Sequence, residues 1–297
     1  MKDSFSIIDM RCRPPYKGFL YNGYPFGLYD TSDASLTAKF GLMTDFQYPL
    51  YLRNPRMALF LRDMDEAGVD YGVAPYRAAW GDPENNRGLI DNGDLLELMQ
   101  EYPDRFIGVA GISPVYGGVD HAVEQIERFC VQGPMKGILM EPFFDRPNWF
   151  LNDAKLSYPL LEVCRAHHLP VLLTFGGFFG FPKEQLPPLV EALKAFPDVN
   201  FVLCHGGYPE AETVCHMAFM FNNLYISPDM YVIHTPASRV YIDAANYQLR
   251  DRICFGSACP GISMQTAVRH YMNCGIRKEV LGNILSGNAA RLFNMTL

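Results

Sequence analysis

The sequence lacks any apolar stretch long enough to cross a membrane. No run approaches the roughly 18 apolar residues that a bilayer-spanning helix needs, and Asp9 ends the short apolar segment near the start of the chain. That segment is also too short for the hydrophobic core of a secretory signal. We therefore expect a cytoplasmic protein with no membrane-spanning part.

Basic residues are scarce as well. The 297 residues include 25 Lys and Arg against 32 Asp and Glu, which gives a formal net charge of −7. This balance argues against general binding of nucleic acid or of anionic membrane surfaces, although it is compatible with a local basic pocket. We expect a small molecule, and not a nucleic acid, as the binding partner.

No Cys-x-x-Cys motif is present either. The eight cysteines are scattered along the chain. In a large chain without a signal segment, this distribution favours free and mostly buried thiols over a disulfide framework.

Also missing is a Gly-x-Gly-x-x-Gly turn after the first predicted strand, which dinucleotide-binding sheets usually carry. Instead, short apolar runs alternate with amphipathic stretches, which predicts βαβ units and a parallel sheet. Eight such units close most economically into a single (β/α)₈ barrel over residues 1–297, with an open doubly wound sheet as the alternative. The predicted strands are Ser6–Cys12, Val69–Pro75, Phe106–Ile112, Met135–Glu141, Leu169–Thr174, Asn200–His205, Asn223–Ser227 and Arg252–Ser257. Helices are predicted over Pro55–Ala67, His121–Val131, Tyr158–His167 and Glu184–Ala195.

The segment Pro14–Asn54 interrupts this alternation. It joins the first strand to its helix, is much longer than an ordinary βα loop, and is rich in aromatic residues, Gly and Pro. In a barrel it would lie at the carboxyl ends of the strands, where active sites are built. It is either a lid or wall of the pocket, or an insertion that packs on the barrel or forms a subunit contact.

Several segments, in their order and spacing, resemble the amidohydrolase-related barrels of the aminocarboxymuconate-semialdehyde decarboxylase type. Ile7–Arg13 has the shape of that family's opening Asp-x-His-x-His strand. The resemblance implies a TIM barrel, a hydrolase or decarboxylase activity, and a homodimer. The other matching segments are Phe106–Pro114, Met135–Pro142, Tyr158–Leu172, Phe201–Gly207, Ile253–Ser257 and Ile284–Phe293.

The resemblance breaks down at the metal ligands. In metal-dependent members, the His pair of the first strand, a His at the end of the fifth and an Asp at the end of the eighth hold a divalent metal. The matching positions here are Arg11, Arg13, Thr174 and Ala258. None is a usual zinc ligand, and two permanent cations repel a divalent ion. We expect no metal and no other cofactor at this site.

Arg11 and Arg13 stand two positions apart on a predicted strand, so they are expected to face the same side. A guanidinium has the fork shape that binds a carboxylate or phosphate through two hydrogen bonds. The pair is therefore either a clamp for a substrate anion or a set of internal ion pairs with Glu141 and Asp9, which would satisfy their buried charge.

His205 matches the acid/base histidine that the family carries at the end of its sixth strand. Its unperturbed pKa near 6.5 suits proton transfer around neutrality. Cys12 lies between Arg11 and Arg13, and Cys204 precedes His205. Both thiols are expected to point toward the helices, and Cys259 is expected to be an inert loop thiol. Further candidates for substrate contacts, at or just after strand ends, are Tyr76, Arg77, Glu141, Thr174, Asp229 and Ser257.

Three functions remain open from the sequence. The first is a metal-independent hydrolase of a small anionic, cyclic or aromatic carboxylate, with an activated ester or lactone favoured because water activation is weaker without a metal. The second is a decarboxylase of the same superfamily, in which His205 protonates a carbanion. The third is a degenerate barrel that binds a small acid without transforming it.

Overall fold

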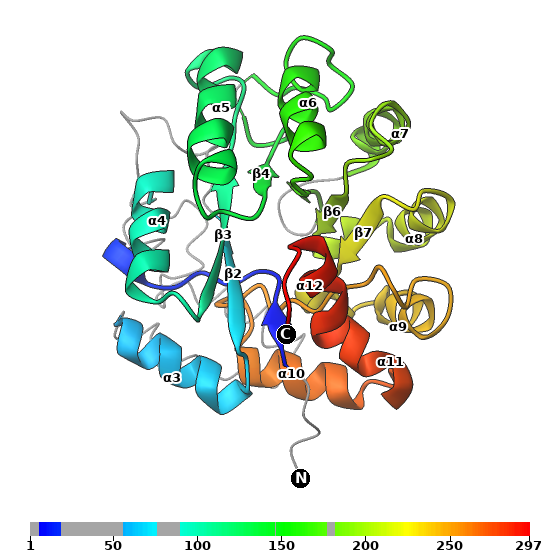
Figure 1. Ribbon diagram of the computed structural model, residues 1–297. Helices are drawn as coiled ribbons and strands as arrows, with labels where there is room; N and C mark the ends of the chain where they lie inside the picture. Colours follow the sequence, from blue (N-terminus) through cyan, green and yellow to red (C-terminus); the bar gives the residue numbers. More distant parts are fainter. Residues whose placement is uncertain (1–5, 19–55, 76–89, 146, 177–181) are drawn as a thin grey trace.

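The computed structural model describes residues 6–18, 56–75, 90–145, 147–176 and 182–297. Within them, seven parallel strands form one curled sheet in chain order, and the helices lie around its outside (Figure 1). This is the predicted TIM barrel. The strands are β1 Ile8–Asp9, β2 Tyr71–Pro75, β3 Phe106–Gly111, β4 Ile138–Met140, β5 Val171–Thr174, β6 Phe201–Cys204 and β7 Leu224–Ser227.

The eighth side of the barrel is irregular. The predicted strand Arg252–Ser257 runs between β7 and β1, but it makes only one bridge, between Ile226 and Ile253. Backbone hydrogen bonds hold it on both sides, from Cys254 N to Ile226 O at 2.9 Å and from Met10 N to Phe255 O at 3.0 Å. The predicted position of this segment between the seventh and first strands is confirmed. The predicted regular strand is wrong, because the segment lacks continuous strand pairing.

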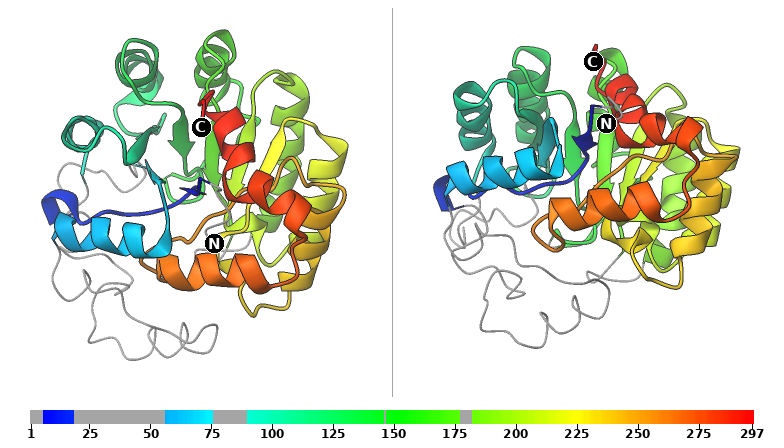
Figure 2. Two further views of the ribbon diagram at one scale, coloured as in Figure 1. Left: turned by 60° about the horizontal axis from the view of Figure 1, so that its bottom comes forward. Right: turned by 90° about the horizontal axis from the view of Figure 1, so that it is seen from below.

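The helices also close into a ring. Helix α3, which follows β1, packs against α10, which follows the irregular eighth side (Figure 2). Three of the four predicted helices end within about two residues of the observed bounds. The fourth, His121–Val131, is α5 continued by a π-helical turn, η4. The helices are α3 Met57–Ala67, α4 Asn92–Glu101, α5 Gly118–Ile126, η4 Glu127–Val131, α6 Tyr158–Ala166, α7 Leu186–Ala195, α8 Ala211–Met220, α9 Ser238–Asn246, α10 Met264–Asn273, α11 Lys278–Gly282, η9 Asn283–Gly287 and α12 Asn288–Leu292.

Two clusters of buried apolar side chains make up the core. The larger lies between the strands and the helices. The smaller fills the barrel interior with residues such as Val109, Leu139 and Leu172, and α12 adds Ala289 and Phe293 to it. Because Tyr71 and Tyr225, at the starts of β2 and β7, pack on the same cluster, α12 covers the amino-terminal end of the strands. The opposite end is left for polar side chains.

Most of the predicted insertion, residues 19–54, lies outside the described residues. Its first residues are fastened to α4, because Tyr16 Oη donates to Glu101 at 2.8 Å and Lys17 Nζ donates to Asp94 at 2.7 Å. Within the described part of the chain, no helix is both long and apolar enough to cross a membrane.

Candidate active site

Polar side chains gather at the carboxyl ends of the strands. Glu141 directly follows β4, Thr174 ends β5, His205 directly follows β6 and Asp229 lies two residues beyond β7. The strand register, in which Thr174 pairs with Cys204, and Cys204 with Ser227, sets these ends side by side. All four side chains are buried. Tyr76 and Arg77, also predicted here, lie outside the described residues.

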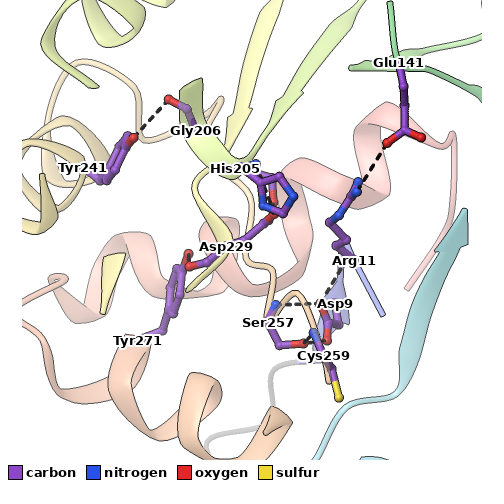
Figure 3. Close-up of polar contacts among 11 residues, drawn as sticks. Asp9, Arg11, Glu141, His205, Gly206, Asp229, Tyr241, Ser257, Cys259 and Tyr271 are labelled. Carbon is purple, nitrogen blue, oxygen red and sulfur yellow. Dashed lines mark hydrogen bonds and ion pairs between the residues drawn. The ribbon is translucent and has the colours of Figure 1, made fainter. Parts of the chain in front are cut away.

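Arg11 reaches across the end of the barrel toward Glu141 (Figure 3). Its Nη2 lies 3.9 Å from Glu141 Oε1, close enough for an ion pair but too far for a hydrogen bond. The side chain is 0% exposed, and besides the ion pair with Glu141 it makes a side-chain hydrogen bond with Cys204, which leaves most of its five N–H donors unused by the described residues. A buried cation with unused donors is prepared to bind an anion.

The strand that was predicted to run through Cys12 ends at Asp9, so strand alternation does not place Arg11 and Arg13. Asp9, predicted as a partner of the arginines, accepts from the Arg11 backbone N at 3.1 Å, from Ser257 N at 2.8 Å and from Ser257 Oγ at 2.5 Å. Burial raises the pKa of Asp9 to about 7, against the lowering effect of these hydrogen bonds. Asp9 and Ser257 therefore join β1 to the irregular eighth side of the barrel, and the Ser257 hydroxyl donates to Asp9 and accepts from Cys259 N.

His205 is paired with Asp229. Its Nδ1 lies 3.0 Å from Asp229 Oδ2, and the same oxygen accepts from the His205 backbone N at 3.1 Å. The edge of the His205 ring meets the Tyr231 ring at a centroid distance of 5.7 Å. Both His205 and Asp229 have positive φ, 63° and 55°, a conformation that non-glycine residues seldom adopt outside functional sites and tight turns.

The carboxylate of Asp229, predicted as a substrate contact, is held by neighbouring residues of the barrel. The carboxylate is completely buried, with Oδ2 at His205 and Oδ1 accepting from Ser227 Oγ. Tyr271 Oη donates to the Asp229 backbone O at 3.2 Å. Both carboxylate oxygens of Asp229 are thus engaged, one by His205 and the other by Ser227. Sequence reasoning missed Ser227 and Tyr271, although the Ser-x-Asp spacing at the end of β7 was a usable signal.

The pKa shifts of His205 and Asp229 set the charge of each residue at neutral pH. Burial, together with the positive charge of Arg11, lowers the pKa of His205 to about 4, although Asp229 acts in the opposite direction. Burial acts to raise the pKa of Asp229, but the hydrogen bond and charge of His205 and the charge of Arg11 outweigh it and hold that pKa below its usual value. At neutral pH the imidazole is therefore neutral and the carboxylate ionised. Arg13, which is also buried, adds to the lowering at His205.

The thiols near the site are poor nucleophiles. Cys204 packs in the interior cluster and does not face the helices as predicted. Regular alternation along β6 places Val202 and Cys204 inside and Leu203 outside, and the positive φ of His205 breaks that alternation only after Cys204. Burial raises the pKa of Cys204 to about 12, despite the opposing effect of Arg11 close by. Burial also raises the pKa of Cys12 well above its ordinary value, and Cys259 is buried too. A nucleophile needs the thiolate form, which these pKa values disfavour for Cys12 and Cys204.

The donor set does not fit a divalent metal. In the part of the chain that the structure describes, no group of three or more His, Cys, Asp or Glu side chains is placed to hold a metal ion. The guanidinium of Arg11 lies in the middle of the cluster instead, and it repels a cation at short range.

The family model described as "Amidohydrolase" matches residues 8–295. This chain belongs to the amidohydrolase family. An uncharacterised TIM-barrel protein from Bordetella bronchiseptica is 29% identical to it, with a TM-score of 0.84 and coverage of 97% of this chain and 98% of that one. A search of curated proteins found no match.

Two further amidohydrolase-like structures have enzyme names. The 4-oxalomesaconate hydratase of Rhodopseudomonas palustris is 21% identical, with a TM-score of 0.66 and coverage of 97% and 95% of the two chains. The 5-carboxyvanillate decarboxylase of Novosphingobium aromaticivorans, solved with manganese and a nitrobenzoic acid, is 14% identical, with a TM-score of 0.69 and coverage of 99% and 97%. At these identities the two structures show a common fold.

Proposed function

We propose that this amidohydrolase is a metal-independent hydrolase of a small carboxylate substrate, with an activated ester or lactone as the bond that is cleaved. One observation carries the proposal, which is the neutral His205 held at Nδ1 by the ionised Asp229. An ionised carboxylate accepts the proton of Nδ1, so the lone pair of the ring lies on Nε2. That nitrogen can accept a proton from water.

The hydrolytic step balances with the groups in place. A water molecule bonds to the substrate carbonyl carbon as its proton passes to His205 Nε2, and the Asp229 carboxylate stabilises the resulting imidazolium. The bond from that carbon to the leaving oxygen then breaks, and the imidazolium returns the proton to the leaving oxygen. Arg11, most of whose donors are unused by the described residues, binds the negatively charged part of the substrate.

A decarboxylase is the second candidate, because several of the similar structures are decarboxylases. Protonation of a carbanion by His205 would require a proton on Nε2 at the start. The low pKa of His205 and its contact with Asp229 place the single ring proton on Nδ1 instead. An arginine that holds the departing carboxylate would also oppose loss of its charge. These features favour water activation over carbon–carbon cleavage.

The test is an assay of chelator-treated protein, with metal content measured by mass spectrometry, on carboxylate-bearing lactones and esters in ¹⁸O-labelled water. We expect turnover with one ¹⁸O in the product and no release of CO₂. His205→Asn should lower kcat at least 100-fold, whereas the exposed His216→Asn should have no effect. Release of CO₂, or activity that requires an added divalent metal, would contradict the proposal.

A further inference from the structure

Thr174 carries a buried hydroxyl that the proposed mechanism does not use. The residue ends β5 and is 0% exposed, and its Oγ1 makes no hydrogen bond to any residue that the structure describes. Buried hydroxyl groups in native proteins nearly always have a partner, so one without a partner needs an explanation.

The hydroxyl faces the interior of the barrel. Along β5, Leu173 belongs to the outer core cluster and Leu172 to the interior one. Side chains alternate along a strand, so Thr174 points to the same side as Leu172.

Arg11 extends over this position. Its guanidinium lies 3.9 Å from Glu141, which follows β4, and close enough to the Cys204 thiol of β6 to affect its pKa. Strand β5 lies between those two strands, with Leu173 paired to Met140 and Thr174 paired to Cys204. A group that reaches both neighbours of β5 passes in front of its last residue, Thr174.

We propose that Thr174 Oγ1 and the Arg11 guanidinium form one carboxylate-binding subsite of the substrate. This inference rests on the proposed hydrolase function and assigns its substrate class. Arg11 donates two N–H groups to the carboxylate, and Thr174 donates the hydroxyl proton as a third hydrogen bond.

The subsite also limits the distance between the carboxylate and the bond that is cleaved. Thr174 and the His205 segment occupy neighbouring strand ends, which lie about 5 Å apart in a parallel sheet. The substrate therefore carries its carboxylate about two to four bonds from the carbonyl carbon that His205 serves. Short lactones and esters with a carboxylate near the reacting carbonyl fit this spacing, and long-chain acids do not.

The test compares benzoate and benzamide, which differ in the carboxylate and not in shape, by titration calorimetry. We expect the wild-type protein to bind benzoate at least tenfold more tightly than benzamide. Thr174→Val keeps the shape but removes the hydroxyl, and should weaken benzoate binding about tenfold while leaving benzamide binding unchanged. Thr174→Ser should restore affinity to within about threefold, and Thr174→Ala serves as a second hydroxyl-free variant if Thr174→Val does not fold.

The outcomes separate this inference from the function on which it rests. If the wild-type preference for benzoate survives Thr174→Val, the shared subsite is wrong while anion binding by Arg11 stands. If wild-type protein shows no preference for benzoate, the subsite and the proposed carboxylate specificity both fail. His205→Asn should be inactive yet bind benzoate as the wild type does, and loss of benzoate binding in this variant would contradict the separation of the subsite from the acid/base pair.

Discussion

At the scale of single residues, the contact between Asp229 and His205 Nδ1 makes a sharp prediction. Asp229→Asn presents an amide N–H to that nitrogen and favours the wrong tautomer of the imidazole, with the proton on Nε2. We expect kcat to fall by about 10²–10⁴-fold with a much smaller change in KM. The matched control is Asp243→Asn, which alters an exposed carboxylate paired with Arg239 and should leave the kinetic constants unchanged.

The lowered pKa of His205 predicts how activity and stability depend on pH. Because the folded-state pKa is about 4, the imidazole remains a base well below pH 6.5, and the acid limb of kcat/KM should lie near pH 4. The unfolded chain takes up this proton near pH 6.5. The contribution of His205 to the free energy of unfolding therefore decreases as the pH falls from about 6.5 to about 4.

Arg13→Met tests the electrostatic part of this explanation. It removes a positive charge that lowers the pKa of His205, so the NMR titration midpoint of the His205 ring should move to higher pH. The exposed His216 supplies the internal reference in the same spectra. An unchanged midpoint for His205 would show that Arg13 does not contribute, and would assign the lowering to burial and Arg11.

At the scale of secondary-structure elements, the position of Asp229 depends on a glycine in the irregular eighth side of the barrel. A Cβ at Gly256 would lie 2.8 Å from Ser227 Oγ and closer still to Asp229 Oδ1. Gly256→Ala should displace both groups, lower kcat by at least tenfold and lower the free energy of unfolding by about 1–3 kcal/mol.

The control for that variant is Gly287→Ala. Gly287 has helical backbone angles, and its nearest obstacle is the end of the Asn283 side chain at 3.2 Å. The change should be neutral or stabilise the protein by up to about 1 kcal/mol, without effect on kcat. Chemical denaturation and steady-state kinetics of both variants give the comparison. Full activity of Gly256→Ala would show that Asp229 tolerates displacement.

The order of elements was predictable from the sequence, because apolar periodicity reports burial directly. The exact ends of the elements, which depend on side-chain hydrogen bonds, and their irregular turns were not predictable. β1 ends at Asp9, three residues earlier than predicted. There the Asp9 carboxylate, and not a backbone carbonyl, accepts the hydrogen bond of the Ser257 backbone N–H. The π-helical turn Glu127–Val131 continues an α-helix, and the apolar spacing of the sequence did not distinguish it from a regular α-helix.

The same division holds for the candidate site. The sequence placed Glu141 and His205 at neighbouring strand ends, and the structure has them there, because the carboxyl ends of parallel strands meet at one edge. Arg11, which lies beyond the end of β1, reaches them through its long side chain. The role of Asp229 depends on the positive φ of His205 and of Asp229 itself, which turns the two side chains toward each other. A residue pattern read from one strand at a time cannot reveal such a pairing between neighbouring strand ends.

At the scale of the whole molecule, Asp9 makes closure of the barrel dependent on protonation. Its pKa in the folded protein is raised from 3.8 to about 7. Between these values the unfolded chain loses the Asp9 proton while the folded protein keeps it, so the free energy of unfolding decreases as the pH rises through this range. Asp9→Asn removes this effect. Relative to wild type, the variant should gain stability as pH rises from 4 to 8, up to a limit of about 4 kcal/mol at about 1.4 kcal/mol per pKa unit.

Urea denaturation of both proteins at several pH values measures this difference, and ionisable groups elsewhere in the chain cancel in the comparison. A difference that stays constant between pH 4 and pH 8 would mean that Asp9 ionises in the folded protein as readily as in the unfolded chain.

The buried guanidinium of Arg11 connects the stability of the molecule to its surroundings. An anion bound there supplies hydrogen bonds that the described residues do not. A ligand that binds only the folded state, at a hundred times its Kd, adds about 2.7 kcal/mol to the free energy of unfolding. The share of this protein that escapes proteolysis in a cell would then rise and fall with the supply of its carboxylate, so that the abundance of the protein reports the concentration of a metabolite.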